Sequence, residues 1–180
     1  MKKFTIASIV AGGVVAAAAG VFAASHAVKD VELAFPADYK TTFSNYFTGD
    51  RQNGKQIISI YANDIAMKGA QTDGRLPYGS ILIGELTPAV TDEEGDPLES
   101  SLGHLISSNK VAKIVMMQRI EGNDARYGDD LKVGDWEFEV FSASGENLGK
   151  DTTACRECHH PLTDTEFMWS IEHLTQKVSD

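Results

Sequence analysis

The chain has only two cysteines among its 180 residues, and both fall within one five-residue stretch near the C-terminal end. A structural zinc site needs four ligands, and no second Cys/His pair is present to complete one. A thioredoxin-like redox pair would need a βαβ context, which the sequence does not show. A disulfide closing so short a loop would add little stability and would leave the neighbouring His159 unexplained.

Basic residues are also scarce, with 16 Lys and Arg against 26 Asp and Glu, which gives a formal net charge of −10. Binding to nucleic acid phosphates requires clustered positive charge, so this balance argues against a nucleic-acid partner. An acidic surface can steer association with a basic redox partner, and it also serves solubility alone.

Long hydrophobic runs are missing except at the N-terminal end, where two lysines precede an apolar run from Phe4 to Ala24 and then Ser25-His26-Ala27. This order is typical of a secretory signal peptide, predicted here as residues 1–27, with Ala23 or Ala24 as alternative cleavage points. An uncleaved membrane anchor is the rival interpretation, since the run is long enough to span a bilayer. Both interpretations put residues 28–180, a single domain, in the periplasm, and the preferred one leaves it outside the membrane.

The informative motif is Cys155-Arg156-Glu157-Cys158-His159. Cys-x-x-Cys-His is the attachment sequence of c-type haem, in which two thiols become thioethers on the porphyrin and the histidine binds the iron. One helical turn presents both sulfurs and the imidazole to a single haem. The sequence therefore predicts one covalently attached haem c, with Cys155 and Cys158 as attachment residues and His159 as the proximal iron ligand.

Alternating apolar and polar residues between turn clusters predict a mostly antiparallel sheet with few helices, an α+β fold. The expected strands cover residues 43–47, 57–61, 80–86, 111–119 and 136–141. A short helix is expected over 63–68, and two acidic segments, 91–101 and 121–134, are expected to be solvated loops.

The C-terminal end is predicted to be helical, with about one turn at Cys155–His159 for haem attachment. Thr163-Asp164-Thr165-Glu166 has the pattern of a capping box and predicts the start of a second helix. That helix would present an apolar face, which we expect to pack on the sheet. The face would consist of Phe167, Ile171, Leu174 and Val178.

Three segments resemble the family of cytochrome P-460 and cytochrome c′-beta: residues 60–63, residues 76–85, and residues 136–141 followed by the haem motif and Phe167. The likeness extends from about Val31 to Val178. It implies a β-sheet mono-haem c-type protein, usually a homodimer, whose iron is five-coordinate with His159 proximal and an open distal side.

One departure from the family pattern lies at Gly84. In cytochrome P-460 the residue before the matching glutamate is a lysine bonded to the porphyrin, a link that goes with oxidation of hydroxylamine. Glycine cannot form this link, so the resemblance shifts toward cytochrome c′-beta. A glycine within a strand marks either a close approach by a ligand or a bend of the sheet, and both readings stay open here.

The function depends on the sixth position of the iron. If that position is empty, the protein binds small gases such as NO and CO; the alternatives are an oxidoreductase acting on hydroxylamine or NO, and an electron carrier with a sixth Met or His ligand. An apolar pocket would favour neutral gases over charged ligands. Its expected lining residues are Gly84, Phe43, Tyr46, Phe47, Tyr61, Phe138 and Phe141.

Overall fold

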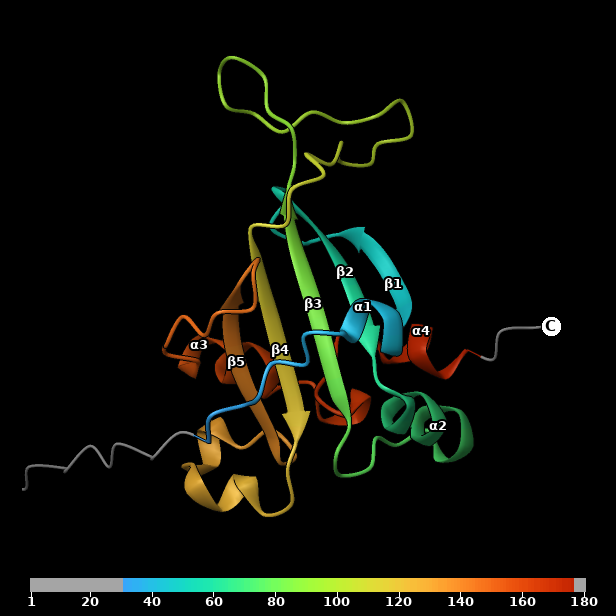
Figure 1. The fold of residues 1–180 in the computed structure, drawn as a ribbon, viewed down its shortest axis with the longest axis vertical. Coiled ribbons are helices and arrows are strands. Elements are labelled where there is room, and N and C mark those ends of the chain that lie inside the picture. The colour runs from blue at the N-terminus through green and yellow to red at the C-terminus, as the bar shows by residue number, and fades with distance from the viewer. Residues whose placement is uncertain (1–30, 177–180) are drawn as a thin grey trace, which may run out of the picture.

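A computed structural model describes residues 31–176, so the predicted signal peptide and Val178 lie outside the described residues. Five antiparallel strands form one sheet in chain order (Figure 1). The strands are β1 (Ser44–Asp50), β2 (Gln56–Ala62), β3 (Ile81–Pro88), β4 (Lys113–Arg119) and β5 (Trp136–Ser142). The α-helices are α1 (Tyr39–Thr42), α2 (Asp64–Asp73), α3 (Thr153–His159) and α4 (Ile171–Thr175).

This architecture confirms the predicted α+β fold with a mainly antiparallel sheet. Each predicted strand overlaps an observed one, because β-branched and apolar residues alternate with polar ones between turn residues. The helix expected over 63–68 is longer than predicted and continues to Asp73. It ends at Gly74, whose φ of 66° suits a left-handed C-cap.

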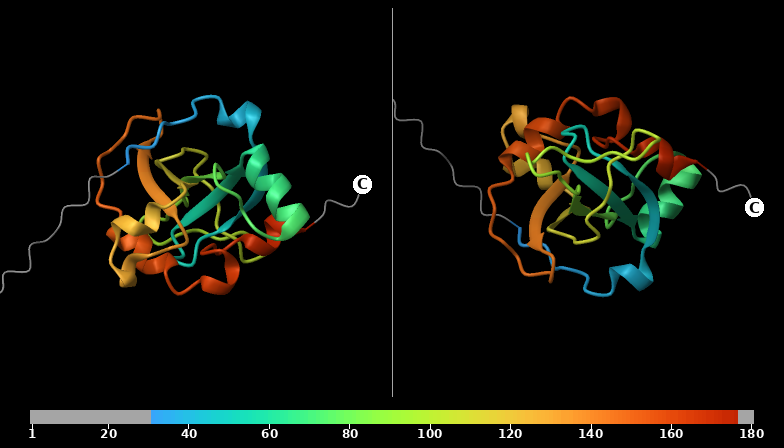
Figure 2. Two further views of the ribbon diagram at one scale, coloured as in Figure 1. Left: turned by 90° about the horizontal axis from the view of Figure 1, so that it is seen from below. Right: turned by 90° about the horizontal axis from the view of Figure 1, so that it is seen from above.

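The two faces of the sheet are covered by different parts of the chain (Figure 2). Residues 31–43 cover what we call the N-terminal face, and α2, α3 and α4 lie on the other, the attachment face. The N-terminal face buries Leu33, Tyr39, Ile83, Ile114, Met116 and Phe141. The attachment face buries Ala62, Ala66, Ala70, Leu76, Leu82, Met117, Val133, Trp136, Phe138, Met168, Ile171 and Leu174.

The free edge of β5 is protected by its own side chains. Glu137 accepts a hydrogen bond from the backbone N–H of Phe138, and Glu139 accepts one from that of Val140. These bonds occupy N–H groups that an edge strand would otherwise offer to another chain, which guards against edge-to-edge pairing.

The predicted capping box does not open an α-helix, and this prediction was wrong. Thr163–Thr165 forms one 3₁₀ turn, and Glu166 has a φ of 53°, outside the right-handed helical region. The Glu166 side chain binds two arginines instead of capping a backbone N–H. Of the predicted apolar face, Ile171 and Leu174 are buried within α4, which begins only after this turn.

The acidic segment 91–101 lies in an arm that projects beyond the sheet between β3 and β4 (Figure 1). Isolated bridges hold the arm together, pairing Ala89 with Ser107 and Glu99 with Leu105. Leu102 at its turn is 82% exposed. Segment 121–134 is a loop with two 3₁₀ turns, η1 (Asn123–Arg126) and η2 (Asp129–Leu131).

Within residues 31–176, every helix is too short or too polar to cross a lipid bilayer.

Asn63 joins α2 to the sheet, so we expect Asn63→Ala to be destabilising. Its side chain accepts from the N–H groups of Ala66 and Ile81 at 3.0 and 3.1 Å and donates to the Gly79 carbonyl at 2.9 Å. Losing the N-cap and two further bonds should lower the free energy of unfolding by about 2–3 kcal/mol, measured by urea denaturation. Asn53→Ala, in an exposed turn, is the control and should cost less than about 1 kcal/mol. Equal effects at both positions would contradict this account.

Candidate haem-attachment site

The two cysteines and the histidine of the motif lie on the single helix α3. Both cysteines are free thiols; Cys155 is partly buried and Cys158 is exposed. Burial, with a smaller contribution from Cys158, raises the pKa of the Cys155 thiol. The described residues include no cluster of three or more His, Cys, Asp or Glu side chains that could hold a metal ion.

His159 is held in one orientation by two contacts. Its Nδ1 lies 2.6 Å from the carbonyl oxygen of Phe167, and its ring lies 5.0 Å from that of Phe138. Burial lowers the pKa of His159, and the Phe167 bond opposes this only in part. The ring is therefore neutral at pH 7, with the proton on Nδ1, and the lone pair of Nε2 is available to a metal.

The Phe167 carbonyl is positioned by a turn that few residues adopt. Glu166 and Phe167 have φ values of 53° and 62°, in the left-handed region that costs energy for residues other than glycine. The Glu166 carboxylate binds Arg119 at 2.7 Å and Arg75 at 3.5 Å, and its carbonyl accepts from the Trp136 indole at 3.1 Å. These bonds hold the turn that presents the carbonyl to His159.

Gly134 makes room for the same turn. A Cβ atom at this position would lie 2.5 Å from the Phe167 ring, and the φ of Gly134 is 66°. Both the close approach and the left-handed backbone exclude a larger residue without a shift of Phe167.

The middle of the attachment face carries a row of apolar side chains around a glycine. Paired residues in an antiparallel sheet share a face, and the register here aligns one residue from each of the five strands. The row consists of Phe47, Ile60, Gly84, Val115 and Val140. Its four side chains are only partly buried, and none of the five residues belongs to either buried core cluster. The row is thus an apolar surface beside the cluster that contacts Cys155.

Gly84 itself lies between Ile58 and Val115. A Cβ atom here would stand 3.0 Å from Ile58 Cδ1 and 3.0 Å from Val115 Cγ2. Its backbone conformation is ordinary β, and the pairing with Ile60 and Val115 continues without a register shift. Local crowding thus favours glycine, and no bulge at this position of the sheet requires it.

Of the seven predicted pocket residues, the structure brings four to the attachment face: Gly84, Phe138, Tyr46 and Phe47. Phe43, Tyr61 and Phe141 belong to the cluster on the N-terminal face, on the other side of the sheet from α3. Strand alternation accounts for this, because neighbours along a strand point to opposite faces. A register shift between Asn45 and Phe47 breaks the alternation in β1, so Tyr46 and Phe47 both lie on the attachment face.

Methionine and histidine side chains that could act as a sixth iron ligand are widely distributed in the fold. Met117 and Met168 are buried on the attachment face, and Met116 is buried on the N-terminal face. His160 Nδ1 lies 2.8 Å from the Lys132 carbonyl oxygen. Two others also have partners: His104 contacts Asp50 on the arm side, and His173 of α4 stacks on Phe47 with ring centroids 4.6 Å apart.

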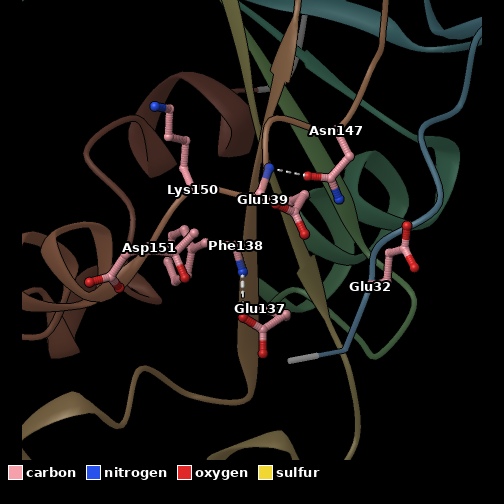
Figure 3. A pocket seen from close by; sticks show the side chains of 9 residues that line it. Glu32, Glu137, Phe138, Glu139, Asn147, Lys150 and Asp151 are labelled. Carbon is pink, nitrogen blue, oxygen red and sulfur yellow. Dashed lines mark hydrogen bonds between the residues drawn. The ribbon is translucent and has the colours of Figure 1, made fainter. Parts of the chain in front are cut away.

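A pocket of about 520 Å³ opens at the edge of β5 (Figure 3). Its walls come from β5, the N-terminal segment and residues 147–152, and they include Glu32, Glu137, Glu139 and Asp151. Carboxylates at four positions make this pocket unsuitable for a porphyrin, which needs apolar walls. The attachment face, with its apolar row and free thiols, fits a haem far better.

The thiols and the imidazole of α3, and the apolar surface near them, are arranged as haem attachment would require. Two free thiols and an imidazole of fixed tautomer lie within one short helix, and an apolar row lies on the face that this helix covers. A family model described as Cytochrome P460 matches residues 36–170. A search of curated proteins finds no match.

Tyr46 ties β1 to the segment before α4, and its titration gives a test at high pH. Its hydroxyl lies 2.8 Å from Ser170 Oγ, and burial raises its pKa to about 12, with the Ser170 bond acting in the opposite direction. A raised pKa in the folded state means that stability is complete below pH 10 and is lost as pH rises toward 12.

We therefore expect this hydroxyl to cost the parent protein about 2–3 kcal/mol of stability between pH 10 and 12. Tyr46→Phe has no hydroxyl to ionise, so it should not show that part of the loss. At pH 7 the same variant should lose about 1 kcal/mol with the Ser170 bond. Urea unfolding at pH 7, 10, 11 and 12 measures both effects. An unchanged slope of stability against pH in Tyr46→Phe would show that this hydroxyl is not buried.

Proposed function

Because the chain belongs to the cytochrome P460 family, a family of haem cytochromes, we propose that it is a periplasmic mono-haem c-type cytochrome whose open, five-coordinate iron binds small neutral gases such as NO and CO. The observation that carries the proposal is the geometry of α3, where Cys155, Cys158 and His159 lie on one turn.

Three residues of α3 would hold the haem in different ways. Cys155 and Cys158 would form the two thioether bonds, and His159 Nε2 would bind the iron. The Phe167 carbonyl keeps the proton on Nδ1 and holds the ring in place. When bound, the haem supplies an iron that takes up a diatomic ligand.

The apolar row on the attachment face supports gas binding over chemistry on charged substrates. Ile60, Val115 and Val140 offer no hydrogen-bond donor, and charged ligands lose their hydration in such surroundings without compensation. Family members cap the iron with a phenylalanine, and Phe47, a member of this row whose ring contacts that of His173, is our assignment for that role.

Gly84 supports the gas-binding role over hydroxylamine oxidation. In the resemblance, this position holds the lysine that bonds to the porphyrin, and Gly84 lies on the attachment face, where such a lysine would have to be. Glycine leaves the porphyrin without that link and lets it approach the strand closely.

The proposal also includes export of the chain and its assembly with partners. Residues 1–27 would be removed as a signal peptide, which leaves residues 28–180 as one haem domain in the periplasm. An acidic chain with a net charge of −10 suits a basic redox partner. The homodimer implied by the resemblance stays a prediction, and light scattering of the purified protein measures it.

Visible spectra of the oxidised, reduced and CO-treated protein test the proposal. We expect a five-coordinate iron whose reduced spectrum shifts when CO or NO is added, because the predicted distal side is apolar and open. A six-coordinate, low-spin spectrum that ignores CO would contradict the proposal and select an electron carrier. A strongly red-shifted reduced Soret band would favour the lysine-linked enzyme and a cross-link from another lysine.

Two adjacent histidines give a matched test of the proximal ligand. His159→Ala should keep haem bound through the thioethers but change the iron spectrum, because the axial nitrogen is lost. His160→Ala is the control: it removes only a bond to the Lys132 carbonyl, so its spectrum should match the parent protein. If the two variants give the same spectrum, His159 is not the proximal ligand.

A further inference from the structure

A buried ion pair joins the attachment helix to the edge strand. Arg156, which stands between the two cysteines, is 1% exposed, and Glu137 on β5 is 2% exposed. Arg156 Nη2 lies 2.8 Å from Glu137 Oε1. Burying two charges costs several kcal/mol each, and such pairs often add no net stability. Stability alone therefore does not account for the pair.

The Glu137 carboxylate is the centre of a network that gathers four donors. Oε1 accepts from Arg156 and from the backbone N–H of Phe138 at 3.0 Å. Oε2 accepts from Asn123 Nδ2 at 3.1 Å and from the Tyr127 hydroxyl at 2.7 Å. Such saturation satisfies the acceptor positions of the carboxylate and fixes it in the interior.

The arginine is equally constrained. Its guanidinium carbon lies 3.3 Å from the centroid of the Tyr127 ring, and Nη1 donates to the Leu131 carbonyl at 3.4 Å. Stacking and hydrogen bonds of this kind hold the planar guanidinium in one place. The positive charge therefore has a fixed position beside the carboxylate.

Both residues of the ion pair are connected to His159. Arg156 precedes His159 by three residues, so the two side chains leave neighbouring positions on the helix surface. Phe138, whose N–H binds Glu137, places its ring 5.0 Å from the His159 ring. The carboxylate thus holds both the helix that carries the ligand and the strand residue that the ligand packs on.

We propose that Glu137 and Arg156 are positioning residues for the proximal histidine and that their balanced charges set the reduction potential of the haem. This rests on the proposed function, since it assumes a haem iron bound to His159. With both residues present, the pair itself carries no net charge. Removing the carboxylate leaves a buried cation, which favours the reduced, less positive iron; removing the guanidinium does the reverse.

The test is a spectroelectrochemical titration of the full haem-loaded protein. Glu137→Gln should raise the reduction potential and Arg156→Met should lower it, each changing the ratio of oxidised to reduced haem at a fixed ambient potential by roughly tenfold. The double variant should return close to the parent value. Asp129→Asn, which removes the exposed pair with Lys132, is the control and should leave the potential unchanged.

Opposite shifts are the signature of a charge effect, because simple loosening of the helix would move both single variants in the same direction. Shifts of the same sign, or none, with CO binding intact would overturn this inference and leave the proposed function standing. Failure of the parent protein to carry haem would instead overturn the proposed function.

If Glu137→Gln or Arg156→Met carries no haem, the charge-conserving variants decide the matter. Glu137→Asp and Arg156→Lys keep the signs of the two charges, so both should load haem and keep the potential close to that of the parent. Failure of both to load haem would reduce the pair to a packing role and overturn the inference.

Discussion

The hydrogen bond between His159 Nδ1 and the Phe167 carbonyl is the contact on which the site depends, because it decides which ring nitrogen can bind a metal. A left-handed turn at residues 166–167 presents that carbonyl, and a single carboxylate, Glu166, joins the turn to two arginines. Gly134 leaves space for the Phe167 ring. The strain in this turn is thus stored beside His159, the proposed iron ligand, and strained backbone is common at functional sites.

The two faces of the sheet differ in how completely the rest of the chain covers them. Residues 31–43 seal the N-terminal face, where the buried Glu85 carboxylate receives a hydrogen bond from Tyr39 and pairs with Lys40 at 2.7 Å. The attachment face is covered by helices at one end, while its middle row of apolar side chains stays partly exposed. A sheet closed on one side and open on the other supplies a rigid apolar surface for a flat cofactor.

Much of this arrangement follows from the sequence, and the failures have physical causes. The strands were predictable, because two-residue alternation is a local signal. Thiol spacing is a local signal too, and haem attachment at Cys155 and Cys158 stays a prediction. The face of the sheet on which each side chain lies was not predictable. Tyr61 and Phe141 point away from α3 because of the strand register, which depends on distant strand pairing. The capping-box pattern at 163–166 also misled, because tertiary ion pairs to Glu166 outweighed a local helix signal.

The central claim is that haem is covalently attached to α3 through both cysteines. Intact mass of the denatured protein, after coexpression with a system for c-type haem maturation, tests this directly. The account predicts the mass of the processed chain plus one haem, and failure to retain covalent haem when both Cys155 and Cys158 are replaced by serine. A colourless protein with the mass of the bare processed chain would contradict it.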